Sequence, residues 1–310
     1  MTRAGFVAVI GAPNAGKSTL VNHLVGSKVS IVTRKVQTTR FPVRGVAMEG
    51  DAQMVLVDTP GIFTPRRRLD RAMVRAAWGG AQDADAVVHL IDAEAHARVA
   101  DGNARGADHL AVRDCETITK GLASASRRAL LALNKIDLLR KERLLGLAEA
   151  LHHPAVYGEV FMISATRGAG VAKLKETLAA AMPEGPWFYP PEQSADIPTR
   201  LLAAEITREK IYLRVHEELP YATAVETTAF EERSDGSARI EQTVYVERDG
   251  QRAILLGKGG ATLKWIGQAA REELCELLER PVHLFLHVKV DPGWSEDRHR
   301  YGEVGLDFDV

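Results

Sequence analysis

The sequence predicts an α/β protein in which a doubly wound domain with a phosphate-binding loop is followed by a smaller α+β domain. Three observations support this prediction. A Gly-rich loop lies between an apolar run and a helical segment near residue 10, several buried-strand patterns follow it, and a Pro-rich stretch precedes a second set of helix and strand patterns. With 310 residues, the chain is long enough for two domains.

Composition and charge narrow the classes of function. The net charge is −1, but residues 201–310 carry 14 Lys and Arg against 21 Asp and Glu, so a nucleic-acid site there must be a local patch. No apolar run approaches the ~20 residues of a membrane span, and the first apolar run leads into the Gly-rich loop rather than a secretion signal. Cys115 and Cys275 have no metal or redox spacing, so we expect plain helix residues in a reducing cytoplasm.

The Gly-rich loop fits the pattern Gly-x4-Gly-Lys-Ser/Thr at residues 11–18. The apolar run at 5–10 predicts a buried strand before it, and residues 19–25 have helical spacing after it, so the loop opens a helix N-terminus that favours anions. We expect Lys17 to reach the terminal phosphates and Ser18 to supply a magnesium ligand. The candidate phosphate-binding residues are Gly11, Ala12, Pro13, Asn14, Ala15, Gly16, Lys17, Ser18 and Thr19.

A second motif, Asp58-Thr59-Pro60-Gly61, follows the second of two predicted strands at 43–48 and 53–57. A carboxylate at the end of an apolar strand that faces a phosphate loop is suited to hold magnesium. The backbone N–H of Gly61 is placed to touch a γ-phosphate. We therefore expect residues 58–61, together with Ile62 after them, to line the nucleotide site.

Two further apolar strands are predicted, at 86–91 and 129–133. The second of them runs into Asn134-Lys135-Ile136-Asp137, where we predict that the base is recognised. The Asp137 carboxylate can accept two hydrogen bonds, from N1–H and the 2-amino group of guanine, whereas adenine offers no matching donor pair. Lys135 can lay its stem over the base, and Asn134 can bridge the base and the phosphate loop. Another strand leads into Ser164-Ala165-Thr166, where a backbone N–H, that of Ala165, can meet guanine O6.

In order and spacing, these pieces resemble the translation-factor-like GTPases over residues 1 to about 182. The resemblance implies a doubly wound sheet that binds GTP or GDP with magnesium at the carboxyl ends of its strands. It also implies a switch threonine in Gln37-Thr38-Thr39-Arg40 that senses magnesium and the γ-phosphate. Thr38 and Thr39 are both candidates, and relatives that have Thr-Arg favour Thr39. The implied catalytic residues are Lys17, Ser18, Thr39, Asp58 and Gly61, of which Ser18, Thr39 and Asp58 hold magnesium.

Ile62 departs from the Ras type, which has a water-orienting Gln at this position. We therefore expect slow intrinsic hydrolysis, or another group that holds the water. Asn14 is a candidate potassium ligand beside the phosphates, as in related GTPases that share it, and the alternative is a hydrogen bond within its own loop. The stretch 64–69 is predicted to be a mobile second switch, and its basic run at 66–68 to be a solvated face or an RNA contact.

The Pro-rich stretch at 183–198 holds five of the 13 prolines and predicts a linker, part of which packs on a domain through Trp187, Phe188 and Tyr189. A helix is predicted from Thr199 to Glu217, with Leu202, Ile206 and Leu213 on roughly one face. Alternating patterns at 223–232 and 237–247, joined at Ser-Asp-Gly, predict a hairpin. The expected domains are 1–182, a linker at 183–198, and 199–310 with a terminal tail.

The second region contains Gly257-Lys258-Gly259-Gly260, followed by helical spacing and a last apolar strand at 281–290. This order of elements resembles a type II KH domain, whose Gly-x-x-Gly loop clamps about four nucleotides. Four basic residues and no acidic ones lie between Arg252 and Arg271, which makes the local patch that an acidic domain needs. The candidate RNA-binding residues are Gly257, Lys258, Gly259, Gly260, Lys264 and Arg271.

Together, the two halves resemble a family of bacterial GTPases that assemble the ribosome. The resemblance implies a GTP-controlled switch that binds 16S rRNA near its 3′ end during 30S subunit assembly, as a cytoplasmic monomer with peripheral association with the inner membrane. Two alternatives remain: an RNA-binding module whose nucleotide domain barely turns over, and a phosphate-loop kinase or ATPase, against which residues 134–137 argue. Residues 93–126 carry no recognisable motif.

Overall fold

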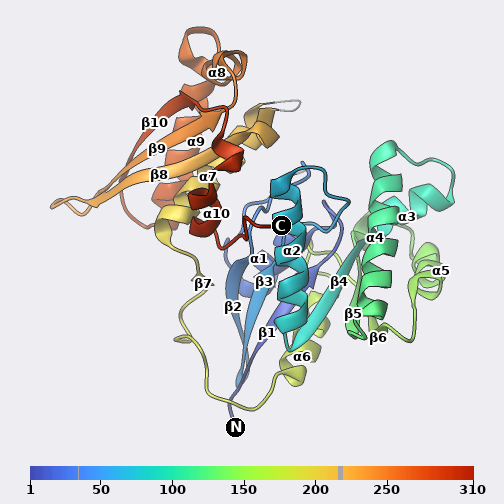
Figure 1. Ribbon diagram of the computed structural model, residues 1–310. Helices are drawn as coiled ribbons and strands as arrows, with labels where there is room; N and C mark the ends of the chain where they lie inside the picture. Colours follow the sequence, from blue (N-terminus) through green and yellow to red (C-terminus); the bar gives the residue numbers. More distant parts are fainter. Residues whose placement is uncertain (34, 216–218) are drawn as a thin grey trace. The chain divides into compact units, whose positions relative to one another are not determined.

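The computed structural model describes residues 1–33, 35–215 and 219–310, which form two units: residues 1–196 with 301–310, and residues 197–300 (Figure 1). The first unit is built on a sheet whose described strands lie in the order β6-β5-β4-β1-β3-β2-β7. The strands are β1 (Arg3–Ile10), β2 (Val43–Glu49), β3 (Ala52–Asp58), β4 (Ala86–Asp92), β5 (Ala129–Asn134), β6 (Tyr157–Met162) and β7 (Ala195–Asp196).

Parallel pairing dominates among the described strands of this sheet, and β2 pairs antiparallel with β3 and with β7. One core lies under α1 (Lys17–Val25) and α6 (Val171–Ala181), and a second lies under α2 (Arg68–Asp83), α4 (Gly106–Ser124) and α5 (Lys141–Leu151). The strands are therefore covered on both faces, as buried parallel sheets require. The predicted doubly wound fold is confirmed, and the carboxyl ends of β1, β3, β5 and β6 lead into the predicted motifs.

The segment without a recognisable motif forms α3 (Ala93–Ala100) and then α4. Asp92 caps α3 by accepting a hydrogen bond from Ala95 N, at 3.1 Å. Arg98 of α3 makes two hydrogen bonds to Asp108 of α4, at 2.8 and 3.0 Å. Cys115 is buried in α4.

The linker packs on the first unit at its aromatic residues. Trp187 donates from Nε1 to Asp51 O at 3.1 Å, and Phe188 stacks on Phe6 with 5.2 Å between ring centroids. Gln53, fully buried in β3, accepts from the backbone N–H of Phe188 at 2.8 Å and of Tyr189 at 3.0 Å, and donates back to Tyr189 O at 2.8 Å. Buried polar groups need such partners, so Gln53 fixes the path of the linker.

The second unit has the predicted order of helix, two strands, loop, helix and strand, and a short helix precedes the loop. Its elements are α7 (Thr199–Arg214), β8 (Thr223–Glu232), β9 (Ala238–Val246), α8 (Asp249–Leu256), α9 (Ala261–Leu277) and β10 (Val282–Val290). The described strands lie in the order β10-β9-β8, with β9 parallel to β10 and antiparallel to β8. Apolar side chains of α7, α8 and α9 pack on the sheet around Ile211, Val244 and Ile266.

Three sequence predictions differ from the structure. Residues 301–310, assigned to the second domain as a tail, belong to the first unit, because their contacts are made there. The helix predicted to reach Glu217 is described to Arg214, and residues 216–218 lie outside the described part of the chain. Leu213, placed on the apolar face of that helix, is 52% exposed, whereas Ile206 is fully buried.

Candidate functional site

The phosphate loop runs from the end of β1 into α1, as predicted. Gly16 caps α1 with φ 99°, and a Cβ atom there would lie 2.3 Å from Nδ2 of Asn134. Glycine is therefore required both for the left-handed backbone and for the close approach of Asn134. The exposed Asn14 is also left-handed, with φ 63°.

Lys17 lies folded back over the loop. Its Nζ donates to Gly11 O at 3.1 Å and to Ala12 O at 3.0 Å, and the residue is only 7% exposed. Burial lowers the pKa of Lys17 to about 8, and the nearby Asp58 carboxylate partly opposes this shift. A buried ammonium with only carbonyl partners is poorly compensated, so an added anion would stabilise its charged form.

Three side-chain oxygens converge beside Lys17. Ser18 Oγ donates to Asp58 Oδ2 at 2.7 Å and lies 2.9 Å from Thr39 Oγ1, which also donates to Asp58 Oδ2 at 3.2 Å. Asp58 is completely buried, and its Oδ1 has no hydrogen-bond partner among the described residues. Burial raises the pKa of Asp58, and the nearby Ser18 hydroxyl, the Lys17 charge and the hydroxyls of Ser30 and Thr39 pull it back.

This oxygen cluster fits magnesium, which prefers hard oxygen ligands and is usually held by one or two carboxylates. The unpartnered Oδ1 is the kind of buried acceptor that a cation or its bound water would satisfy. Thr38, in contrast, bonds to Thr33 Oγ1 at 2.6 Å and donates to Lys35 O at 2.8 Å. The geometry therefore favours Thr39 over Thr38 as the threonine beside the nucleotide.

The turn after β3 brings Gly61 against the phosphate loop. Thr59 donates from Oγ1 to Val9 O at 2.8 Å, which ties the turn to β1, and a Cβ atom on Gly61 would lie 2.9–3.0 Å from Pro13. Ile62 donates its N–H to Gly11 O at 3.1 Å, but its side chain is 2% exposed and belongs to the core under α2. The Ile62 side chain cannot orient a water molecule.

Asn134 joins the phosphate loop to the loop after β6. Its Nδ2 donates to Ala15 O at 2.8 Å, and its Oδ1 accepts from Ala165 N at 2.9 Å. The Ala165 N–H that we expected to meet guanine O6 is thus already used within the protein. Ser164 accepts from Arg167 N at 3.1 Å and orders the same loop. The sequence prediction missed this link because residues 134 and 165 are distant in sequence.

The sequence analysis also did not predict the charged partners of two residues in the base-reading motif, Lys135 and Asp137. Lys135 Nζ lies 2.5 Å from Asp92 Oδ2, and Arg167 Nε lies 3.4 Å from Asp137 Oδ2. Asp92 ends β4, which neighbours β5, so its position beside Lys135 follows from the strand order. The largely buried Asp92 carboxylate can orient Lys135, whereas Arg167 is exposed and its pair with Asp137 is weak.

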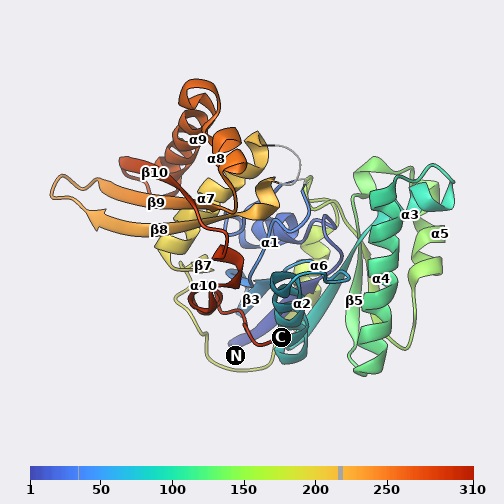
Figure 2. The same ribbon diagram turned by 45° about the horizontal axis from the view of Figure 1, so that its top comes forward.

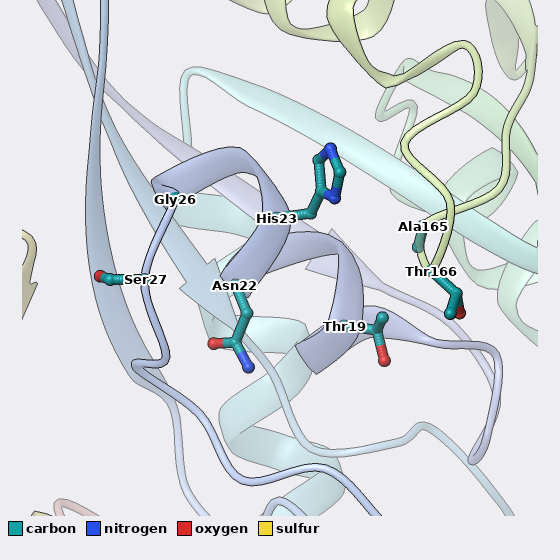
Figure 3. A pocket seen from close by; sticks show the side chains of 7 residues that line it. All are labelled: Thr19, Asn22, His23, Gly26, Ser27, Ala165 and Thr166. Carbon is teal, nitrogen blue, oxygen red and sulfur yellow. The ribbon is translucent and has the colours of Figure 1, made fainter. Parts of the chain in front are cut away.

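A pocket of about 460 Å³ adjoins this region between α1 and the loop after β6. Figure 3 shows Thr19, Asn22 and His23 on α1, with Ala165 and Thr166 on the facing loop. Asn22 fixes the chain after α1 by accepting from Val29 N and Ser30 N, each at 2.9 Å. Two of the residues that line the pocket, Thr19 and Ala165, also belong to the predicted nucleotide site.

The Gly-x-x-Gly loop of the second unit forms a tight turn between α8 and α9. Gly257, Gly259 and Gly260 have φ of 72°, 60° and 78°, and a Cβ atom on Gly257 would lie 2.2 Å from Thr262 Oγ1. The basic candidates of this surface are all exposed: Lys258, Lys264 and Arg271. The loop backbone and these cations are accessible to a polyanion.

Comparisons with known proteins agree with both units. A family model described as 50S ribosome-binding GTPase matches residues 6–135, and a KH domain model matches residues 218–295. The GTPase Era of Caulobacter vibrioides is 65% identical over 309 residues, which cover 100% of this chain and 98% of that protein. GTPase Era of Maricaulis maris is 58% identical over 99% of this chain and 98% of that protein.

Solved structures give the same result. An Era variant of Aquifex aeolicus bound to GDP.AlF4− matches with a TM-score of 0.88 and 35% identity, covering 100% of both chains. Era in complex with MgGDPNP and nucleotides 1506–1542 of 16S ribosomal RNA matches with the same TM-score, identity and coverage. The protein is a GTPase that carries a KH domain. It belongs to the Era family. None of the helices in the described ranges has the length and apolar composition needed to cross a membrane.

The lowered pKa of Lys17 predicts proton uptake on nucleotide binding. With a pKa of about 8, Lys17 is roughly half neutral at pH 8, and bound phosphate raises its pKa. Binding of GDP at pH 8 should therefore take up about half a proton, and affinity should fall as pH rises above 8. Calorimetry in two buffers of different ionisation enthalpy measures the uptake. Lys17→Arg should abolish it, and equal binding enthalpies in both buffers for the wild type would refute the assignment.

Base recognition by Asp137 predicts a change of specificity. In Asp137→Asn, the amide cannot accept both guanine donors, so we expect GDP affinity to fall by about 100-fold, equivalent to roughly 3 kcal/mol for a lost charged pair of hydrogen bonds. The same variant should gain affinity for xanthosine diphosphate. Competition against a fluorescent nucleotide measures both constants, with Asp101→Asn as a surface control. If xanthosine binding does not improve, Asp137 does not face the base.

Proposed function

We propose that this protein is a magnesium-dependent GTPase whose nucleotide state controls binding of its KH domain to the 3′ end of 16S rRNA during 30S subunit assembly. The observation that carries the proposal is the convergence of Ser18, Thr39 and Asp58 oxygens beside Lys17. Asn134, on the same edge of the sheet, joins the phosphate loop to the loop after β6. Phosphate and base recognition are thus built as one site.

The residues of the proposed nucleotide site have different roles in the transfer of the phosphoryl group to water. Lys17, released from Gly11 O and Ala12 O, neutralises charge on the terminal phosphates. Ser18, Thr39 and Asp58 would hold magnesium, which supplies further neutralisation of the phosphate oxygens. Gly61 lets the backbone approach the γ-phosphate, because any side chain there would strike Pro13. Catalysis then rests on positioning and charge rather than on a side-chain base.

Turnover is proposed to be slow without an activator. Ile62 is packed in the core, so no glutamine-like group holds the attacking water from that position. Asn14, exposed in the loop, is our candidate for a potassium ligand that offsets charge developing in the transition state. The buried Ile62 also favours a second candidate function, an RNA-binding protein whose nucleotide domain binds GTP as a scaffold and hardly hydrolyses it.

The RNA half of the proposal rests on the exposed loop and on a relative. An Era structure contains nucleotides 1506–1542 of 16S rRNA, and the present chain has the same fold over its whole length. Lys258, Lys264 and Arg271 offer few cations in an acidic unit, so affinity for RNA should depend only modestly on salt. The cytoplasmic, monomeric state and a peripheral contact with the inner membrane are proposed from the family resemblance alone.

One assay tests both halves together. GTP hydrolysis in potassium buffer should rise about tenfold with a 3′-terminal fragment of 16S rRNA, equivalent to a barrier lowered by roughly 1.4 kcal/mol. The double variant Lys258→Asp, Gly259→Asp should lose this stimulation and keep the basal rate, since neither residue belongs to the proposed nucleotide site. Gly259 has φ 60°, a conformation that Asp adopts more readily than most residues, and a Cβ atom there meets no atom within 4 Å. Replacing potassium with sodium should slow the reaction if Asn14 holds the ion.

The control is Lys173→Asp, which repeats the Lys→Asp replacement at an exposed lysine of α6. If RNA still stimulates GTP hydrolysis by this control, the result supports a protein in which GTP hydrolysis and RNA binding are linked. If RNA leaves the rate of GTP hydrolysis by the wild type unchanged, the linkage is contradicted. If the wild type binds RNA normally but hardly hydrolyses GTP, the scaffold function is favoured.

A further inference from the structure

Three arginines form a stripe on one face of α2. Arg68, Arg71 and Arg75 are spaced three and four residues apart, so they lie along the same side of the helix. This stripe begins seven residues after Gly61, directly behind the proposed second switch. All three arginines contact the segment 307–310, and both views place the end of the described chain beside α2 (Figures 1 and 2).

The contacts differ in kind along the stripe. Arg68 donates from Nη1 to Phe308 O at 3.3 Å, and its guanidinium lies 4.3 Å from the centroid of the Phe308 ring. Arg71 donates from Nε to Val310 O at 3.2 Å, and Arg75 pairs with Asp307 at 3.4 Å. The Arg75 pair is exposed and therefore weak, so the stacked and hydrogen-bonded Arg68 is the main anchor.

The segment is itself folded for this contact. Tyr301 and Leu306 are 3% and 6% exposed, and Leu306 N donates to Tyr301 O at 2.8 Å. The Tyr301 ring meets the Phe308 ring edge-on, with centroids 5.1 Å apart. Phe308 thus contacts both the Tyr301 ring and the Arg68 guanidinium, and the two contacts fix the register of residues 307–310 on α2.

The opposite side of the first turn of α2 is tied to the nucleotide site. Asp70, 6% exposed, accepts from Arg66 N and Arg67 N at 3.0 Å through Oδ2. Its Oδ1 accepts from Gln37 Nε2, also at 3.0 Å. Gln37 lies two residues before Thr39, so the start of α2 is bonded to the segment that carries the proposed magnesium-sensing threonine.

We propose that the arginine stripe of α2 is a docking surface for the chain's own segment 307–310, and that docking is coupled to nucleotide state through Asp70 and Gln37. The coupling rests on the proposed function, in which Thr39 responds to GTP and magnesium. In this structure Thr39 donates to Asp58 and Gln37 donates to Asp70 while the segment is docked. We take this arrangement of residues 37–39 as the one that GTP and magnesium favour, so that the triphosphate state favours docking. By linkage, a docked segment favours GTP to the same degree.

Hydrogen exchange with mass spectrometry tests the proposal on the full chain. We compare the protein saturated with MgGDP and with MgGDPNP, and expect amides of residues 301–310 to exchange about fivefold more slowly with GDPNP, the lower end of usual coupling. The double variant Arg68→Ala, Arg71→Ala should exchange fast with both nucleotides. Arg113→Ala, an exposed arginine of α4, is the matched control and should behave as the wild type.

A second variant separates docking from coupling. Gln37 has φ 56°, a backbone conformation that Asn tolerates, and Asn is too short by one methylene to keep the contact with Asp70. Gln37→Asn should therefore keep slow exchange in residues 301–310 but lose its dependence on the nucleotide. This result would assign the coupling to Gln37 and Asp70.

Nucleotide affinity, measured on the same samples, distinguishes the possible failures. If the wild type binds both nucleotides but exchange is equal in the two states, the coupling is refuted and the proposed function stands. If the double arginine variant exchanges as slowly as the wild type, the docking surface is refuted. If the wild type fails to bind GDPNP, the proposed function fails, and the coupling fails with it.

Discussion

The nucleotide domain depends on partners that stabilise the buried Asp58 carboxylate. This carboxylate is completely buried at the end of a central strand, where an uncompensated charge would be costly. The Asp58 charge is stabilised by hydrogen bonds from Ser18, at the start of α1, and from Thr39, in the polar segment between α1 and β2. The Lys17 charge stabilises it further. One side chain thereby holds together a strand, a helix and a loop that are about 20 to 40 residues apart in sequence.

Most of the fold and the identity of the site were predictable because the motifs have fixed spacing and lie at strand ends. The predicted strands at 43–48 and 86–91 match β2 and β4 to within one residue, and the order of the second unit is as predicted. Apolar strands and Gly-rich turns are local patterns, which a sequence shows directly. The coincidence of five such patterns in one order made the family resemblance specific.

What the sequence could not show depends on contacts between distant residues. Thr38 and Thr39 are chemically identical neighbours, and only the path of the backbone turns one toward Asp58. Ala165 gives its N–H to Asn134 because β5 and β6 are adjacent strands. Helices α3 and α4 lack any motif, and the place of residues 301–310 depends on three arginines more than 230 positions earlier. None of these features leaves a local pattern.

We propose that Ser18, Thr39 and Asp58 together sense the γ-phosphate through magnesium. The most direct measurement is the ratio of GTP-analogue to GDP affinity, with and without magnesium, in Thr39→Val and Thr38→Val. Val keeps the shape of Thr and removes the hydroxyl. We expect Thr39→Val to lose about tenfold of the magnesium-dependent preference for the triphosphate, or roughly 1.4 kcal/mol, and Thr38→Val to keep it. Loss of the preference in Thr38→Val alone would show that Thr38, and not Thr39, senses magnesium.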